Sequence, residues 1–136
     1  MSFAGERATR SHSFVVALAS REAFALFEPE GERAWAQGWD PQYVHPRDGR
    51  AEAGMVFTTD HGGENTIWIM TRHEPAAGLV EYVRTTPGSR IATVMVQCAP
   101  LGPLSRSSRS WASGFCGMIA WAKIAIRQST IRKTTE

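Results

Sequence analysis

The stretch "TIWIMTRHEPAAGLVEYVRTTPGSRIATVMVQCA", residues 66–99, decides the fold. It contains three runs rich in β-branched and aromatic residues, at 66–73, 79–86 and 91–99. Short segments that contain proline and glycine separate them. Such runs are typical of strands, and the residues between them are typical of turns. Because turns this short join antiparallel neighbours, the stretch predicts an antiparallel meander.

The segments on the N-terminal side extend this pattern. Residues 12–20 and 53–60 alternate in hydrophobicity, which predicts a further strand in each. Between them, residues 20–27 and 30–38 predict two short helices, and residues 40–49 have the composition of a loop, with two prolines and a closing Asp-Gly. The order is therefore one strand, two short helices and at least four antiparallel strands.

The C-terminal part of the chain differs from the rest. Residues 1–100 hold 9 Lys+Arg and 12 Asp+Glu, a net charge of −3, whereas residues 101–136 hold 6 and 1, a net charge of +5. Within the second part, residues 114–133 predict a helix, because apolar side chains follow the 3.6-residue period. These are Phe115, Met118, Ile119, Ala122 and Ile126. The whole order predicts an α+β domain in which a helix covers one face of the sheet.

Composition narrows the class of protein. A chain of 136 residues, 43% hydrophobic and 21% charged, predicts one globular domain over 1–136. Two cysteines, Cys98 and Cys116, are too few for a disulfide framework and favour a cytoplasmic protein. No run reaches the length of a membrane-spanning helix, and the N terminus lacks the apolar segment of a signal peptide.

The sequence lacks the motifs of several kinds of catalytic or binding site. The sequence has no glycine-rich phosphate loop, no nucleophile elbow and no His-x-x-x-His or Cys-x-x-Cys spacing, so we expect no cofactor and no metal site. The basic run at 105–110 holds two arginines, which is weak support for a nucleic-acid partner, and we expect none. His61 and His73 fall at strand ends or turns, where solvated histidines are common.

A second stretch, "EGERAWAQGWDP" at residues 30–41, carries a Glu…Trp…Gly-Trp-Asp-Pro pattern at Glu32, Trp35, Gly38, Trp39, Asp40 and Pro41. With the strands described above, it resembles small bacterial members of the START-like, or SRPBCC, superfamily, over about residues 11–100. That superfamily includes the Bet v 1 allergens, polyketide cyclases and Hsp90-ATPase-activator-like domains. The resemblance implies a helix-grip fold, in which a curved antiparallel sheet wraps a C-terminal helix and a cavity between them holds an apolar or amphipathic ligand.

After Pro100 the chain departs from this pattern. The family places two more strands and a long helix there, whereas this chain continues with "LGPLSRSSRSWASGFCGM". One hypothesis is a change of reading frame near residues 101–105, since a shifted frame around Trp111 can encode Val-Gly-Leu, close to what the family places there. The alternative is a divergent native C terminus over 101–136. If 114–133 is the gripping helix, the sheet lacks two strands, and its open edge predicts low solubility or a homodimer.

We expect the cavity to be lined by aromatic residues, methionines and two polar groups. These are Trp35, Trp39, Tyr43, His45, Met55, Phe57, Trp68, Met70, Tyr82, Arg84 and Met95. Rigid rings and adaptable methionines suit an apolar ligand of variable shape, and a guanidinium suits a ligand carboxylate. The alternative is packing alone, as a plug under the helices for Trp35, a mixed role for Trp39 and ordinary core for the strand residues. Either interpretation predicts that both tryptophans are buried.

These features favour a module that binds a small hydrophobic or amphipathic ligand, lipid- or polyketide-like, with no catalytic residue assigned. One alternative is a polyketide cyclase- or aromatase-like enzyme that uses a cavity His, Arg or Tyr with water. Another is an Hsp90-activator-like protein-interaction domain. The sequence leaves open which face of residues 79–86 points into the cavity, because both faces carry apolar side chains.

Overall fold

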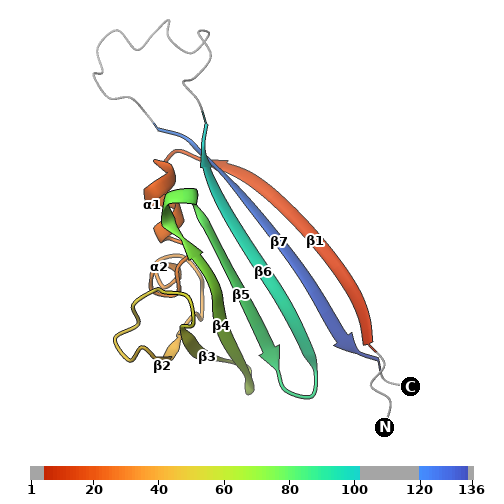
Figure 1. Ribbon diagram of the computed structural model, residues 1–136. Helices are drawn as coiled ribbons and strands as arrows, with labels where there is room; N and C mark the ends of the chain where they lie inside the picture. Colours follow the sequence, from red (N-terminus) through yellow and green to blue (C-terminus); the bar gives the residue numbers. More distant parts are fainter. Residues whose placement is uncertain (1–4, 102–119, 135–136) are drawn as a thin grey trace, which may run out of the picture.

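The computed structural model describes residues 5–101 and 120–134. They form a seven-stranded antiparallel sheet with strand order β1-β7-β6-β5-β4-β3-β2 (Figure 1). The strands are β1 (Gly5–Val16), β2 (Gln42–His45), β3 (Val56–His61), β4 (Glu64–Glu74), β5 (Leu79–Thr86), β6 (Arg90–Pro100) and β7 (Ala122–Lys133). The helical elements are α1 (Ser20–Ala25), α2 (Pro29–Glu32) and the 3-10 helix η1 (Pro75–Ala77).

The predicted meander is confirmed. Strand β5 has the predicted bounds, and it pairs antiparallel with β4 on one side and β6 on the other. Tyr82 lies opposite Met70 in β4 and opposite Val94 in β6. This register places Tyr82 and Arg84 on the same face of the sheet as the buried Met70, which resolves the ambiguity of the strand.

The predicted C-terminal helix is wrong over residues 122–133, which form strand β7. Its side chains alternate, with Ala122 and Ile124 buried and Lys123 exposed between them. Strand β7 pairs along its length with both β1 and β6, and two hydrogen-bond ladders outweigh the helical spacing of its apolar residues. Residues 102–119, which hold the start of the predicted helix, lie outside the described residues, so the frame-change hypothesis stays a prediction.

The edges of the sheet are β1 and β2. Strand β6 pairs with β7 from Arg90 to Pro100, so the described part of the chain does not have the open edge predicted at β6. The longer edge, β1, carries the exposed charged residues Arg7 and Arg10, which discourage pairing with another chain. Dimerisation through a sheet edge stays a prediction.

The core lies between one face of the sheet and the helical segment. We name this the inner face, and the opposite one the outer face. Helix α1 contacts β6 and β7 and buries Ala23 and Phe24. Figure 1 shows α1 and α2 beside one part of the sheet, while β1, β7 and β6 extend beyond them. The described residues hold no helix with the length and apolarity of a membrane span.

Gly78 is required by a close approach of two backbones. It has φ of +66°, and a Cβ there would lie 2.0 Å from the Cys98 carbonyl oxygen. We expect Gly78→Ala to lower the free energy of unfolding by about 3 kcal/mol, because it combines left-handed strain with a backbone clash. The matched control is Gly62→Ala, where φ is +60° and the added Cβ meets open space. Its expected cost is about 1 kcal/mol. Equal losses in urea unfolding would contradict this account.

Candidate functional site

The strand registers arrange the inner-face side chains in rows across the sheet. The row that we name the aromatic row contains, from β1 to β2, Ala8, Thr130, Ala92, Arg84, Trp68, Phe57 and Tyr43. The next row, farther from α1, is the polar row, and it contains Glu6, Arg132, Arg90, Thr86, Thr66 and Thr59. On the other side, the row that holds Met70, Tyr82 and Val94 leads to the core under α1.

An aromatic cluster forms where the aromatic row meets the segment after α2. Its members are Trp39, Tyr43, Phe57, Trp68 and Tyr82. Phe57 stacks on Trp68 with ring centroids 5.6 Å apart, and Tyr82 meets both rings edge-on. Phe57 and Tyr82 are buried, whereas Trp39, Tyr43 and Trp68 are half-buried. The cluster therefore has one side in the core and one accessible side.

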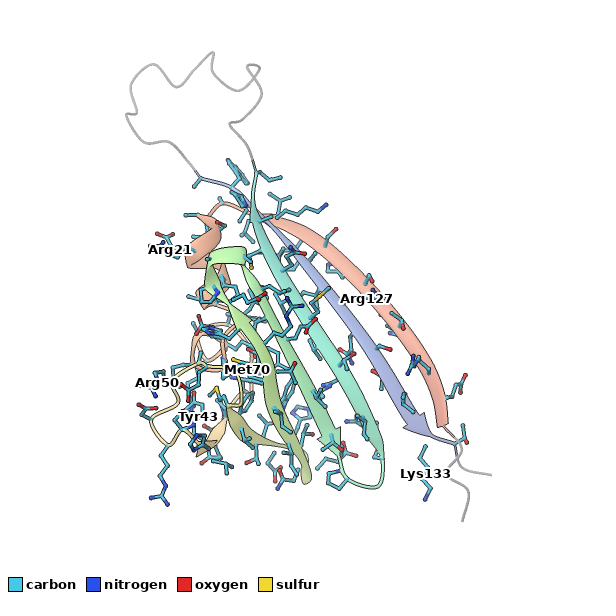
Figure 2. The ribbon with its side chains drawn as sticks, viewed as in Figure 1. Arg21, Tyr43, Arg50, Met70, Arg127 and Lys133 are labelled. Carbon is cyan, nitrogen blue, oxygen red and sulfur yellow. The ribbon has the colours of Figure 1, made fainter. Side chains whose placement is uncertain are left out.

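Hydrogen bonds to main-chain carbonyls hold two of these rings. The Trp39 indole nitrogen donates to the Pro29 carbonyl over 2.8 Å, and the Tyr82 hydroxyl donates to the Phe27 carbonyl over 2.9 Å. Figure 2 shows Tyr43 and Met70 near α2, where many side chains gather. Because the indole N–H of Trp39 already donates to the Pro29 carbonyl, the accessible side of Trp39 is apolar ring surface.

Arg33 holds the segment that carries Trp39. Its guanidinium lies 2.8 Å from the Asp40 carboxylate and 3.1 Å from Glu30, and it donates to the Pro41 carbonyl. The Tyr43 hydroxyl donates a short hydrogen bond to Glu30. That bond, with the one from Arg33, lowers the pKa of Glu30, while burial and Glu30 raise the pKa of Tyr43 to about 12. Tyr43 therefore stays protonated and fixed at the edge of the cluster.

Glu32 places a carboxyl group beside the core. Burial raises its pKa from 4.5 to about 8. The described residues give its side chain no hydrogen bond and no ion pair. Burial is the main cause that raises the pKa of Tyr82, and the charges that Glu32 and Glu28 carry when ionised raise it further. With a pKa of about 8, Glu32 is mostly protonated at pH 7.

His73 contradicts the prediction of a solvated histidine. Its side chain is only 15% exposed, and its Nε2 atom lies 3.7 Å from the Glu28 carboxylate. Its ring packs against Phe24 with centroids 5.7 Å apart. His61, in contrast, is exposed at the end of β3. Within residues 5–101 and 120–134, no group of three His, Cys, Asp or Glu side chains is placed to hold a metal ion.

Most of the predicted lining residues come together on or against the inner face. Met55, Phe57 and Met70 are fully buried and belong to the core, so no ligand reaches them in this arrangement. The accessible members are the half-buried ones, which are Trp39, Tyr43, Trp68 and Arg84.

Met95 and His45 lie on the outer face, contrary to the prediction that they line the cavity. Met95 lies opposite Glu81, one residue out of phase with the inner-face Val94. His45 is exposed and pairs with Val56, because the register shifts between positions 43 and 45. In both cases a one-residue change of phase turns the side chain to the other face.

Trp35 contradicts the prediction that both tryptophans are buried. It is 54% exposed. Its ring packs against Phe27 with centroids 5.5 Å apart, and its indole nitrogen donates to the Leu26 carbonyl over 2.8 Å. It therefore covers the junction of α1 and α2 from outside and forms no part of the aromatic cluster.

Glu32 is a carboxyl group beside the core that the sequence does not single out, except as one position of the Glu…Trp…Gly-Trp-Asp-Pro pattern. Glu28 and Glu30 lie on the same short segment, and no periodicity distinguishes them from Glu32. Which carboxyl lies beside the core depends on how α2 packs near Tyr82, and that packing is a tertiary property.

The solved structures that resemble this chain share one fold. Norcoclaurine synthase from Thalictrum flavum has a TM-score of 0.64 at 11% identity, and the match covers 95% of this chain and 72% of that one. The Zhui aromatase/cyclase from Streptomyces sp. R1128 has a TM-score of 0.63 at 12% identity, covering 96% and 72%. Ara h 8.0201 has a TM-score of 0.61 at 9% identity, covering 96% and 80%.

No protein-family model and no curated protein sequence matches the chain. At identities near one in ten, the solved structures are informative about the fold alone. The strand order and these structural likenesses indicate that the chain has the Bet v 1-like fold.

Proposed function

We propose that the protein binds one small amphipathic molecule on the inner face, against the accessible side of the aromatic cluster. The observation that carries the proposal is the half-buried ring surface of Trp39 and Trp68, directly beside a fully buried core. Half-buried apolar side chains continue this surface along the sheet, and they are Phe14, Val94 and Ile126. Accessible aromatic surface beside a buried core is typical of a site for an apolar ligand.

The similar proteins support this class of ligand. One norcoclaurine synthase structure is a complex with dopamine and hydroxybenzaldehyde, and the Zhui protein is an aromatase/cyclase. Both proteins therefore combine this fold with aromatic small molecules or aromatic chemistry. A bound ring in this chain would stack on Trp68 or Trp39, which contributes about 1 kcal/mol beyond area burial.

Titration with the uncharged fluorophore N-phenyl-1-naphthylamine tests this proposal. We expect saturable 1:1 binding, and Trp68→Leu is expected to weaken it about tenfold, because the exchange removes ring surface and its stacking. The control is Trp35→Leu, outside the aromatic cluster, which should change affinity less than twofold. Native mass spectrometry of the purified protein would identify a retained natural ligand. Absence of 1:1 binding by the wild-type protein would contradict the proposal.

A second candidate function is acid-catalysed loss of water from the bound molecule. The observation that favours it is Glu32, which carries a proton at neutral pH and has no hydrogen-bond partner among the described residues. Tyr82 is engaged with the Phe27 carbonyl, which leaves Glu32 as the proton donor at the cluster. If a retained ligand loses one water with wild-type protein and not with Glu32→Gln, this function is supported. Unchanged ligand in both cases would exclude it for that ligand.

A further inference from the structure

We propose that the ligand carries an anionic head group of the carboxylate or sulfonate type, and that Arg84 binds it. The inference rests on the proposed function, since it assigns the charge at one end of the same bound molecule. It follows from the place of Arg84 in the sheet, from its lack of a partner and from the other cations near it.

Arg84 lies where the aromatic cluster ends. In the aromatic row its neighbours are Trp68 in β4 and Ala92 in β6. The guanidinium carbon lies 5.4 Å from the centroid of the Trp68 ring. That cation–π contact orients the guanidinium, yet neither neighbour can accept a hydrogen bond from it through its side chain. A molecule whose apolar part covers Trp68 would therefore bring its far end to Arg84.

Arg84 differs from the paired arginines in having no acceptor. Its Nε atom is buried and has no hydrogen-bond partner among the described residues, which also offer no carboxylate within ion-pair distance. By comparison, Arg90 lies 3.1 Å from Glu64 and Arg72 lies 2.8 Å from Glu74. A buried donor without a partner is costly, and a native structure rarely keeps one without a reason. An oxyanion from a ligand supplies the missing acceptor.

The surroundings of Arg84 are positive. Burial lowers its pKa, and the charges of Arg90 and Arg132 lower it further. Arg90 and Arg132 lie opposite each other in the polar row, where Glu6 faces Arg132 and Glu64 pairs with Arg90. Glu6 and Glu64 lie beside Arg132 and Arg90, so neither carboxylate compensates the positive charge of Arg84. Charge complementarity therefore favours an anion at this position, and a guanidinium fork suits two oxyanion oxygens.

Two fluorophores with the same ring skeleton separate charge from apolar contact. The sulfonate 1-anilinonaphthalene-8-sulfonate is the anionic counterpart of N-phenyl-1-naphthylamine. We expect wild-type protein to bind the sulfonate about tenfold more tightly than the uncharged amine. Arg84→Met is expected to weaken sulfonate binding about tenfold and to change amine binding less than twofold. Arg84→Lys keeps the charge without the planar guanidinium, so its affinity for the sulfonate should lie between those of wild type and Arg84→Met.

The control variant is Arg72→Met, on the outer face, which should change neither affinity. Circular dichroism checks that each variant is folded, and calorimetry checks 1:1 stoichiometry. If Arg84→Met does not fold, Arg84→Lys and the wild-type ratio of the two affinities decide. An equal loss for both probes, or unchanged sulfonate affinity, would overturn the role of Arg84 and leave the proposed function standing. If neither probe binds wild-type protein, the proposed function itself fails.

Discussion

Replacing Phe57 with alanine is expected to lower the free energy of unfolding by about 4 kcal/mol, which is near the total stability of many small domains. Phe57 is 1% exposed and lies at the centre of the aromatic cluster. It contacts Trp39, Trp68 and Tyr82, each within 6.3 Å between ring centroids. The three rings are held by their own strands or hydrogen bonds, so they cannot close the cavity that alanine leaves.

Urea unfolding followed by circular dichroism measures this loss. The control is Phe14→Ala, a half-buried phenylalanine at the β1 end of the inner face, for which we expect about half the loss. A small effect of Phe57→Ala, comparable with that of Phe14→Ala, would mean that the cluster is not a rigid part of the core. The half-buried rings of Trp39 and Trp68 would then lack the fixed support that a binding surface needs.

Replacing Glu32 with glutamine is expected to stabilise the fold at pH 8 and to leave it nearly unchanged at pH 4.5. Burial raises the folded-state pKa of Glu32 from 4.5 to about 8, so the folded state holds a proton that the unfolded state releases. The stability that this proton contributes is present below pH 4.5 and is lost as pH rises to about 8. One pKa unit corresponds to about 1.4 kcal/mol. Allowing for the partial exposure of Glu32, we expect the free energy of unfolding of the wild type to fall by about 3 kcal/mol between pH 4.5 and pH 8 on account of this group.

The difference in unfolding free energy between wild type and Glu32→Gln, measured at several pH values, isolates this group from others that titrate. The control is Glu22→Gln on α1, where the side chain is exposed, and it should change the unfolding free energy at pH 8 by less than about 0.5 kcal/mol. A difference between wild type and Glu32→Gln that stays the same at every pH would show that Glu32 is not buried as a neutral acid. It would also remove the proton donor on which the second candidate function depends.

The meander was predictable from sequence because each of its strands has its own signal. The residues of β5 carry apolar side chains on both faces and lie between two turns, which predicts a strand buried within the sheet. The predicted bounds agree with the structure. The position of β7 was not predictable in the same way. Ile124 and Ile126 fit both a strand and a helix, and pairing with β1 and β6 decides between them. The pairing with β1 joins residues more than a hundred positions apart in sequence.

The site was predictable as a set of residue types and not as an arrangement. The side chains of Trp39, Trp68 and Arg84 predict contact with a ligand, and the three lie together, with Trp68 and Arg84 on the inner face and Trp39 against it. Met95 has the same chemistry but lies one residue out of phase. Arg84 lacks a hydrogen-bond partner and Glu32 is buried because of how neighbouring elements pack around them. No local sequence pattern predicts that packing.

The central claim is that a small ligand covers the accessible side of the aromatic cluster. The most direct test is a titration of ¹⁵N-labelled protein with N-phenyl-1-naphthylamine, followed through the indole N–H resonances, each assigned by a Trp→Phe variant. The account predicts that the Trp39 and Trp68 resonances move and saturate at one equivalent, while that of Trp35 stays in place. Unmoved Trp39 and Trp68 resonances, or equal shifts at Trp35, would contradict it.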